Sequence, residues 1–364
     1  KNKYSNRYLT FTNKINYISK ADIILIALPT PLTKNYDPDL SYIQSFLNAG
    51  KKYLKKNQIL ILESTSYPGT TTEIIRPMIE KKFKIGKNFY LGYSPERIDP
   101  GRNIQFKKIT KVFSGCTKNC KILINSFYKN FIDETFLVSK NETAEFVKIF
   151  ENIFRAVNIS LVNEMKIIAD VFNINIREVI NAAETKPYGF KRFDPGPGIG
   201  GHCIPVDPFY LTWKAKEFGI HTRFIELAGE INNKIPIWTY NKINENLNKK
   251  NKYIKNSNFL FIGASYKKDI SDVRESPSIK FFKLFIKEKI KFDYHDPHVK
   301  NIHITETKSK LKSISLNPSK LKKYDCVVIL TNHSKVNYEQ ILKYSKIIFD
   351  TRGCLPKNAK VINL

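Results

Sequence analysis

The sequence predicts an α/β protein with two doubly wound domains joined by a helical region. Short apolar runs, such as residues 21–28 and 258–263, alternate with helical segments towards both ends of the chain. A continuous apolar run that stops at Pro or Gly is typical of a parallel strand covered on both faces. Between the two sets, residues 139–250 show helical periodicity without strand patterns. Alternating strands and helices favour open doubly wound sheets, and the helical block favours a connector between them.

Polar residues follow the predicted strands of the first domain. Pro29-Thr30-Pro31, Ser64-Thr65 and Glu96 each come directly after an apolar run. Ligands of open α/β sheets bind beyond the carboxyl ends of the strands, so these residues are candidates for a site. The expected strands of this domain are 21–28, which we place centrally in the sheet, 58–62, 89–93 and 111–114, and the expected helices are 39–54 and a segment after 68–71.

The helical region is expected to begin at a capping box, Ser139-x-x-Glu142, and its first helix to run to about Phe172. Lys148 and Asn152 are four residues apart, so they project from one face of that helix. We interpret the region as a connector and a dimer interface. Its further expected helices are 176–184, 209–218 and 224–248.

The second doubly wound domain is smaller. A helix is expected to begin in the stretch Asp272-Val273-Arg274-Glu275-Ser276-Pro277. The expected domains are 1–138 for a dinucleotide, 139–250 for the helical region with the catalytic loop, and 251–364 for the substrate nucleotide. The expected strands of the last domain are 258–263, 291–294, 326–330 and 346–349.

The amino-terminal signature of a dinucleotide-binding domain is absent from the sequence. Such a domain should open with a strand, a Gly-x-Gly-x-x-Gly turn and a helix, and no such segment occurs. The chain also starts at Lys1 instead of Met. We therefore expect the first βαβ unit to be missing, through trimming of the sequence or truncation of the gene.

Composition narrows the functional class. The 364 residues carry a formal net charge of +28, but Lys is spread along the chain, which is typical of solvated surface positions and not of a nucleic-acid-binding stripe. No run approaches the roughly 18 apolar residues of a membrane span. Five cysteines, an odd number, argue against a disulfide framework, and no signal peptide is evident. We expect a cytoplasmic protein with neither nucleic acid nor membrane as partner.

One loop concentrates the chemistry. Gly196, Gly198, Gly200 and Gly201 lie within six residues, and Cys203 follows with Pro residues around it. Glycines let backbone approach a ligand closely, and the prolines stiffen the loop. The pattern predicts a rigid loop that holds an anionic ligand and directs one thiol towards it.

The order Pro-Gly-Pro-Gly-x-Gly-Gly-x-Cys-x-Pro-x-Asp, residues 195–207, resembles the active-site loop of the UDP-glucose/GDP-mannose dehydrogenase family, the nucleotide-sugar 6-dehydrogenases. The resemblance extends from about Asp22 to Gly353, and its motifs occur in the family's order. They include Pro29-Thr30-Pro31-Leu32, Ser94-Pro95-Glu96-Arg97 and Tyr266-Lys267-x-Asp269-x-x-Asp272-x-Arg274-Glu275-Ser276. The resemblance implies two Rossmann-like domains, NAD as cofactor, and oxidation of a sugar C6 hydroxyl to a carboxylate with two NAD⁺.

The resemblance also implies residue roles. Cys203 is the nucleophile that forms a thiohemiacetal and then a thioester, Lys148 stabilises the oxyanion, and Asp207 positions water or accepts its proton. Asn152 shares the donor role or holds the catalytic water, Glu96 is a second acid/base in the hydrolytic step, and Thr65 is a partner for the water and the nicotinamide. Cofactor contacts are implied for Pro29, Thr30, Ser64, Thr65 and Arg274, and substrate contacts for Glu96, Arg97, Lys148, Asn152, Phe190, Gly196, Gly198, Gly200, Gly201, Tyr266, Lys267 and Arg352.

Several alternatives stay open. The loop resembles the branch that acts on UDP-N-acetylglucosamine, while UDP-N-acetylmannosamine and UDP-glucose stay open as substrates, and the family's products lead to capsule and O-antigen polysaccharides. An inactive UDP-sugar-binding remnant and a basic nucleic-acid binder are rival classes. Asp296 with His295, His298 and His303 is interpreted as a strand-end turn and not as a metal site, and Cys116 with Cys120 as packing.

Overall fold

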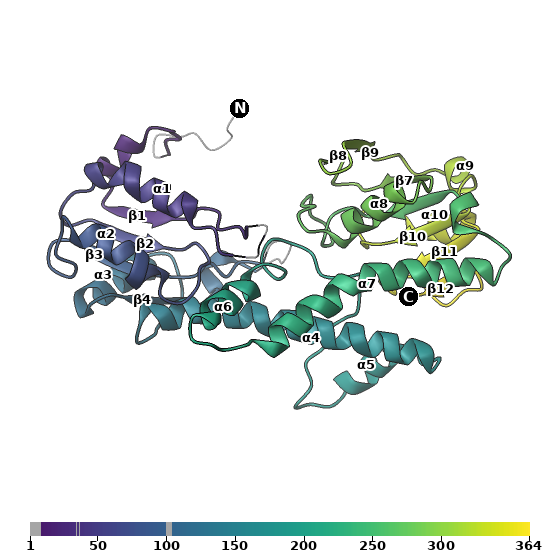
Figure 1. Ribbon diagram of the computed structural model, residues 1–364, viewed down its shortest axis with the longest axis horizontal. Coiled ribbons are helices and arrows are strands. Elements are labelled where there is room, and N and C mark those ends of the chain that lie inside the picture. The colour runs from purple at the N-terminus through teal and green to yellow at the C-terminus, as the bar shows by residue number, and fades with distance from the viewer. Residues whose placement is uncertain (1–8, 34, 36, 100–103) are drawn as a thin grey trace. The chain divides into compact units, whose positions relative to one another are not determined.

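The computed structural model describes residues 9–33, 35, 37–99 and 104–364, so part of the expected amino-terminal stretch, residues 1–8, lies outside the described residues. The chain forms two compact units (Figure 1). Unit 1 comprises residues 1–152 and 206–221, and unit 2 comprises residues 153–205 and 222–364. Each unit is an α/β structure around one five-stranded sheet, which confirms the predicted fold class.

The sheet of unit 1 has the order β1-β2-β3-β4-β5. Its first three strands are parallel, whereas β4 runs antiparallel to β3. The prediction that the first strand is central is wrong for the described residues: β1 is at the edge, and Leu25 is 43% exposed because no described strand or helix covers that side. The strands are β1 (Ile23–Ile26), β2 (Ile59–Leu62), β3 (Tyr90–Tyr93), β4 (Lys111–Gly115) and β5 (Thr135–Leu137).

Helices of unit 1 cover this sheet. Helix α3 begins at Thr117, whose side chain accepts the Cys120 N–H, and buries Cys120 and Ile124 against Phe113. Cys116 and Cys120 therefore serve packing, as predicted. The helical segments are η1 (Ile15–Lys20), α1 (Ser41–Gly50), η2 (Lys51–Tyr53), the π-helical η3 (Thr70–Ile75), α2 (Arg76–Glu80), η4 (Phe106–Lys108), α3 (Lys118–Lys129), the first part of α4 (Asn141–Val171) and α6 (Asp207–Lys216).

The predicted capping box at the start of α4 is wrong. The helix begins at Asn141, and the Ser139 carbonyl accepts a hydrogen bond from Lys121 Nζ. The Glu142 carboxylate does not close back on Ser139 but accepts from Thr72 Oγ1 at 2.6 Å. The Glu142 side chain, which the local pattern assigned to the helix cap, therefore binds Thr72, a residue distant in sequence.

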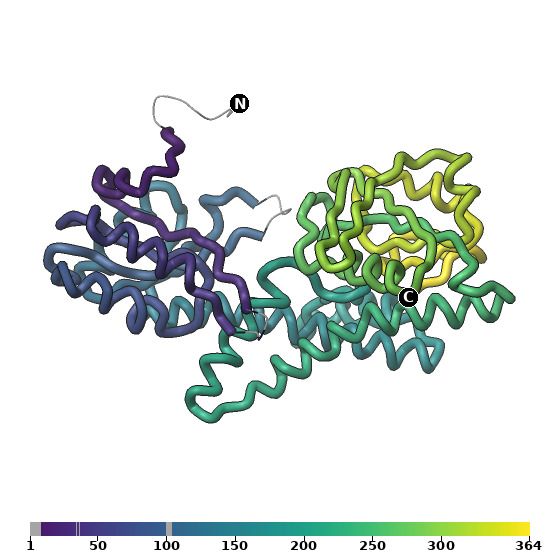
Figure 2. The backbone as a smooth tube through the Cα atoms, turned by 45° about the horizontal axis from the view of Figure 1, so that its top comes forward, coloured from purple at the N-terminus to yellow at the C-terminus, as the bar shows by residue number. Residues whose placement is uncertain are grey.

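In unit 2 the second part of α4 packs along α7 (Arg223–Asn248), and Figure 2 shows the two running side by side. Ser160 Oγ donates to the Ala228 carbonyl at 3.0 Å, and Asn163 Nδ2 donates to Asn232 Oδ1 at 3.1 Å. Helix α5 (Ile176–Glu184) follows α4 with Asn175 as its N-cap. These helices occupy the segments that the sequence predicted.

The sheet of unit 2 is parallel and has the order β12-β11-β10-β6-β7. After β6 the chain adds β7 on one side and then returns to add β10 on the other. The point where the direction of winding reverses, between β6 and β10, is where open α/β sheets bind ligands. The strands are β6 (Phe259–Ile262), β7 (Phe292–His295), β10 (Cys326–Ile329), β11 (Ile347–Asp350) and β12 (Val361–Asn363).

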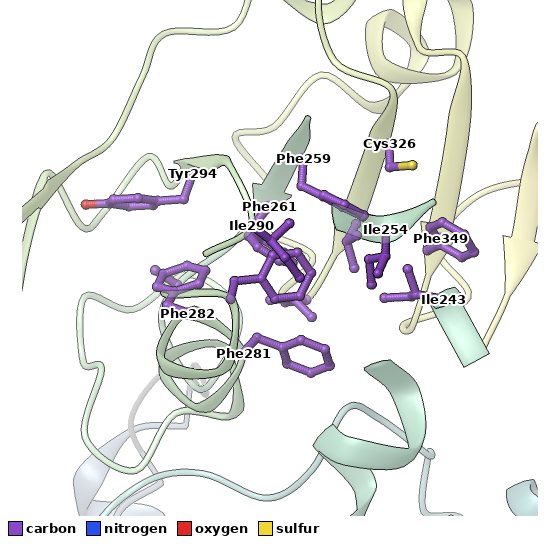
Figure 3. Close-up of a cluster of buried hydrophobic side chains, with 14 of the residues drawn as sticks. Ile243, Ile254, Phe259, Phe261, Phe281, Phe282, Ile290, Tyr294, Cys326 and Phe349 are labelled. Carbon is purple, nitrogen blue, oxygen red and sulfur yellow. The ribbon is translucent and has the colours of Figure 1, made fainter. Parts of the chain in front are cut away.

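Both faces of this sheet are buried. An aromatic cluster that includes Phe259, Phe261 and Phe281 packs on one face (Figure 3), and Leu260, Val327 and Ile348 belong to a separate cluster. Helix α8 (Pro277–Lys287) begins at the end of the predicted stretch 272–277, and Ser276 caps it. The remaining elements are η5 (Ile254–Asn256), the hairpin β8 (Asn301–Ile304) and β9 (Ser309–Lys312), α9 (Pro318–Leu321) and α10 (Tyr338–Tyr344).

A search of the described helices for membrane spans finds none with the length and apolar character to cross a bilayer. The domain limits 138/139 and 250/251 stay predictions.

Candidate active site

Unit 1 brings three of the predicted catalytic side chains together. Asp207, the first residue of α6, is 4% exposed, and Asn152 on α4 is 2% exposed and donates to Asp207 Oδ2 at 2.6 Å. Burial raises the pKa of Asp207 to about 7, while the Lys148 charge and the Asn152 hydrogen bond act in the opposite direction. Because the carboxyl titrates near neutrality, it can both take up and release a proton there.

A second buried carboxylate, Glu145, was missed by the sequence analysis. It is fully buried on α4 and accepts hydrogen bonds from the N–H groups of Gly69 and Thr71, at 2.6 and 2.8 Å, and from Thr71 Oγ1. Burial raises its pKa to about 8, against the effect of these hydrogen bonds. Glu145 precedes Lys148 by three residues, and this spacing on one helix face was the only signal in the sequence. Its contacts attach the helix that carries Lys148 to the loop after β2.

The loops that follow β1 and β2 are fastened to each other. Ser64 Oγ accepts from the Leu28 N–H and donates to the Leu28 carbonyl, each at 2.8 Å, and Thr30 Oγ1 donates to the Thr65 carbonyl at 2.7 Å. In the same loop, Ser66 Oγ is buried without a hydrogen-bond partner. A buried hydroxyl of this kind is available to a polar ligand, so the residues at this edge fit a dinucleotide.

Glu96 and Arg97 follow β3. The Arg97 guanidinium binds Glu151 on α4 at 2.6 Å and the Thr110 carbonyl at 2.9 Å. Glu96 accepts the N–H groups of Arg97 and Ile98 through one oxygen, and its other oxygen lies 3.4 Å from Lys111 Nζ. Arg97 therefore fixes the Glu96 loop to α4, one residue before Asn152. Part of the hydrogen-bonding capacity of its guanidinium is used by the Glu151 carboxylate.

Unit 2 holds the glycine loop, and much of its glycine content serves packing. The N–H of Gly196 donates to Asn163 Oδ1 and that of Gly201 to the Arg274 carbonyl, both at 3.0 Å. A Cβ at Gly200 would lie 2.6 Å from Tyr266 Cβ, and Gly201 has a φ of +93°. These two amides are engaged within the protein, so close approach of the loop to the Tyr266 segment explains at least part of the glycine pattern.

Cys203 is partly buried in unit 2. Arg274 makes a two-pronged contact with Asp272, with Nη2 to Oδ2 at 2.6 Å, and this hydrogen bonding raises the pKa of Arg274. A negative charge on Cys203 would act on Arg274 in the same direction.

The remaining predicted substrate residues follow the strands next to the switch point of unit 2. Tyr266 and Lys267 come after β6, and Arg352 comes after β11. Arg352 Nε donates to the Leu330 carbonyl at 2.7 Å, and burial together with the Arg177 charge lowers the pKa of Arg352 to about 10. Its guanidinium also lies against Gly196, where a Cβ would be 2.8 Å from Nη1.

Lys166 on α4 was also missed. It is 3% exposed, Nζ has no hydrogen-bond partner, and Nζ lies 4.8 Å from the Trp238 ring centre. Burial and the charges of Arg177 and Arg352 lower the pKa of Lys166 to about 7. This side chain adds a third cation to the group around Arg352, and a lone Lys in a helical stretch carries no signal of that role.

The structure thus groups Lys148, Asn152 and Asp207 in unit 1, and places Cys203 with the glycine loop, Tyr266 and Lys267 in unit 2. Phe190 is 40% exposed.

The histidine segment after β7 is a strand-end turn, as predicted. Asp296 Oδ1 accepts the N–H groups of His298 and Val299 at 2.8 and 3.0 Å, and His295 Nδ1 lies 2.7 Å from the Ile314 carbonyl oxygen. His295 and His303 take no part in a metal-binding arrangement among the described residues, whereas His298 lies beside two side chains that the sequence analysis did not consider, Asp269 and His333.

Comparisons with known proteins agree with this geometry. Models of the UDP-glucose/GDP-mannose dehydrogenase family match residues 1–132 (NAD binding domain), 142–234 (central domain) and 260–357 (UDP binding domain). The chain is 32% identical to Protein CapL of Staphylococcus aureus, over 97% of this chain and 84% of that protein. It is 31% identical to UDP-N-acetyl-D-glucosamine 6-dehydrogenase of Salmonella typhi, over 98% of this chain and 85% of that protein.

Among solved structures, the UDP-D-ManNAc dehydrogenase of Pyrococcus horikoshii is similar with a TM-score of 0.86 and 30% identity, covering 97% of this chain and 82% of the other. Identity at this level extends over nearly the whole chain, and the three family domains occur in order. The chain belongs to the UDP-glucose/GDP-mannose dehydrogenase family and is an oxidoreductase, an NAD-dependent UDP-sugar dehydrogenase.

Proposed function

We propose that the protein oxidises the C6 hydroxyl of UDP-N-acetyl-D-glucosamine to the carboxylate, through a thioester on Cys203. The observation that carries the proposal is the group formed by the buried Asp207 and Asn152 with the partly buried Lys148, in which a carboxyl with a pKa of about 7 is placed with an amide and a cation. The glycine loop and the Salmonella typhi relative support the glucosamine substrate. The Pyrococcus horikoshii relative supports UDP-N-acetylmannosamine as the alternative, and UDP-glucose is a third candidate.

The chain's own residues account for the step that a simple alcohol dehydrogenase lacks. NAD, when bound, accepts the two electrons of each oxidation. The Cys203 sulfur adds to the carbon of the aldehyde formed first, and the negative charge that develops on oxygen is stabilised by Lys148 and Asn152. Oxidation of this adduct leaves a thioester. Asp207 then takes a proton from water, the water oxygen attacks the thioester carbon, and the thiolate departs.

The two nucleotides have separate residues. Pro29, Thr30, Ser64 and Thr65 would hold NAD at the edge of the first sheet, with Arg274 on its pyrophosphate. The UDP-sugar would contact Lys267 and Arg352 at the switch point of the second sheet, because cations there suit phosphate oxygens. The other proposed substrate contacts are Glu96, Arg97, Phe190, Tyr266 and the backbone of Gly196, Gly198, Gly200 and Gly201.

The wider setting is proposed on the same basis. The expected domains 1–138, 139–250 and 251–364 would bind NAD, carry the catalytic loop and bind UDP, respectively. The protein would act in the cytoplasm as a homodimer through the helical region, where Phe150, Leu161 and Val171 of α4 are exposed. Its product would supply envelope polysaccharide synthesis.

The test measures NADH formed per sugar by the protein expressed from its complete gene, with each of the three UDP-sugars. We expect about two NADH per UDP-N-acetylglucosamine, and a loss of turnover of about 10³-fold or more in Cys203→Ser, since removing a nucleophile disables its whole catalytic unit. Cys116→Ser, at a partly buried thiol in unit 1, is the matched control and should keep wild-type turnover.

The outcomes separate the candidates. Preference for another UDP-sugar would correct the substrate and leave the mechanism standing. One NADH per sugar would mean alcohol oxidation alone and would refute the role of Cys203. No NADH with any of the three would identify an inactive UDP-sugar-binding protein.

A further inference from the structure

Three ligand-bearing side chains meet at the carboxyl edge of the second sheet, outside the residues of the proposed reaction. Asp269 follows β6, His298 follows β7 and His333 follows β10. One carboxylate oxygen and one ring nitrogen from each His lie within 4.8 Å of one another. Asp269 Oδ1 is 3.7 Å from His298 Nε2 and 3.8 Å from His333 Nδ1.

The hydrogen bonds of His333 determine which of its nitrogens has a lone pair. His333 is fully buried, and its Nε2 lies 3.0 Å from Asp296 Oδ2, while the Asp269 N–H donates to its Nδ1 at 2.9 Å. Because Nδ1 accepts the Asp269 N–H, the proton of the neutral ring is on Nε2 and is directed at Asp296 Oδ2. An ion bound to Nδ1 would take the place of the Asp269 N–H on its lone pair.

This arrangement is the one that metal-ligating histidines commonly have. A His that binds a metal through one nitrogen usually donates its other N–H to a carboxylate, which fixes the orientation of the ring. Asp296 holds that position here, and it also accepts the Ala264 N–H at 2.7 Å, so the support is itself rigid.

His298 supplies an independent observation. Its Nε2 is shielded from solvent and has no hydrogen-bond partner, although the ring lies 5.1 Å from that of His333. A buried polar atom left without a partner costs about 1–3 kcal/mol, and a ligand that satisfied it would recover that free energy. The neighbouring carboxylate oxygen at 3.7 Å is too distant for a hydrogen bond but suits a shared ligand.

We propose that Asp269, His298 and His333 bind one divalent transition-metal ion such as Zn²⁺. Two imidazoles and a carboxylate favour Zn²⁺ and its neighbours over Mg²⁺ or Ca²⁺, which prefer oxygen ligands alone. Tetrahedral Zn²⁺ with bonds of about 2.0–2.1 Å places its ligand atoms about 3.3–3.5 Å apart, so the carboxylate oxygen needs to approach each ring nitrogen by only a few tenths of an ångström. The exposed side of Asp269 leaves the fourth position to water.

The ion would connect three loops, one of which carries Tyr266 and Lys267. On the proposed function, metal binding would therefore hold the nucleotide-binding segment in place and strengthen UDP binding without entering the chemistry. The Lys268 charge acts on Asp269 and would oppose a cation there, which weakens the affinity.

The experiment titrates the chelator-treated full protein with Co²⁺, without UDP-sugar or NAD, and follows visible ligand-field absorption. We expect about one Co²⁺ per chain in the wild type, displaced by Zn²⁺, and affinity at least about tenfold lower in Asp269→Asn and in His298→Ala, as loss of one of three ligands implies. His303→Ala, at an exposed histidine of the same domain, is the control and should bind as the wild type does. His333→Ala is avoided because it would open the core.

Two results would overturn the proposal: absence of Co²⁺ binding in the wild type, or equal affinity in all variants. Intense near-ultraviolet charge transfer from thiolate to Co²⁺ would also overturn it, because the ion would then be on a cysteine. UDP affinity with and without Zn²⁺ tests the coupling, and failure of NADH formation would leave the metal result unaffected.

Discussion

The two units bury charges of opposite sign at corresponding places, where loops and helices meet the carboxyl edge of a sheet. Unit 1 buries the carboxyls of Asp207 and Glu145, and burial raises their pKa values to about 7 and about 8. Unit 2 buries the cation of Lys166 and partly buries that of Arg352, and burial lowers their pKa values to about 7 and about 10. In both units the fold makes the charged form less favourable than in water.

The difference lies in how the charges are compensated. Each carboxyl of unit 1 accepts hydrogen bonds from named donors, Asn152 for Asp207 and Gly69 and Thr71 for Glu145. The cations of unit 2 repel one another, and Lys166 has no hydrogen-bond partner. A compensated carboxyl near neutrality suits proton transfer, whereas a group of cations in which Lys166 has no hydrogen-bond partner suits an anionic ligand. The comparison supports the proposals that Asp207 transfers a proton in unit 1 and that the phosphates of the UDP-sugar bind in unit 2.

The largest expected effect is on kcat and tests the buried carboxyl of Asp207 in unit 1. Lys148→Met should lower kcat by about 10²–10³-fold, as loss of one oxyanion donor does. Wild-type kcat should fall as the pH drops through about 7, where Asp207 becomes protonated, and the variant's acidic limb should move to higher pH because the cation that lowers the pKa of Asp207 is gone. A kcat profile over about pH 6–9 checks this.

Lys140→Met, at an exposed lysine just before α4, is the control for that experiment. An unchanged acidic limb in Lys148→Met would separate Lys148 from Asp207 and contradict the assignment.

A smaller effect, on KM, is expected when one of the cations of unit 2 is removed. Arg352→Gln should raise KM for the UDP-sugar, and weaken UDP binding, by about 30-fold, on the order of 2 kcal/mol for a charge contact with a ligand. The saturated kcat should stay near the wild-type value, because the residue does not touch the reacting atoms in the proposed mechanism. Steady-state kinetics with UDP calorimetry measure both, and Arg76→Gln, in an exposed pair with Glu80, is the control. A fall in kcat with unchanged KM would place Arg352 in the chemistry instead.

The smallest effect concerns stability. Lys166 has a pKa lowered from 10.5 to about 7, so the unfolded chain binds more protons than the native one between those values, and the stability that Lys166 contributes rises with pH across that window. Lys166→Met should therefore stabilise the protein below pH 7 by about 1–2 kcal/mol, and the gain should shrink as the pH rises towards 10.5. Urea unfolding at several pH values measures this.

The exposed Lys234, paired with Glu230, provides the matched control Lys234→Met, which should change stability little at any pH. A gain for Lys166→Met that did not vary with pH would show that packing, and not the buried charge, is responsible.

Many local features could be read from the sequence. Continuous apolar runs predicted β2, β3, β6 and β10, and the start of α8 lies within the predicted stretch 272–277. The failures have tertiary causes. The apolar run around Leu25 predicted a strand buried on both faces, but no described element covers Leu25. The Glu142 carboxylate accepts a hydrogen bond from Thr72 in place of the predicted cap.

The candidate site divides in the same way. Lys148, Asn152, Cys203 and Asp207 could be named because they stand in motifs with a chemical reason for each residue type. Glu145, Lys166 and His333 could not, since each is an ordinary residue type in an unremarkable stretch of sequence and owes its role to partners that lie far along the chain.

The sequence by itself determined the fold class and the family, because hydrophobic periodicity and motif order are properties of neighbouring residues, and its motifs led to the proposal of thiol-centred chemistry. Only the tertiary structure decided which charges are buried, how each is compensated, and which of the predicted glycines serve packing. Desolvation and hydrogen bonding depend on every atom that surrounds a group, and most of those atoms belong to residues distant in sequence.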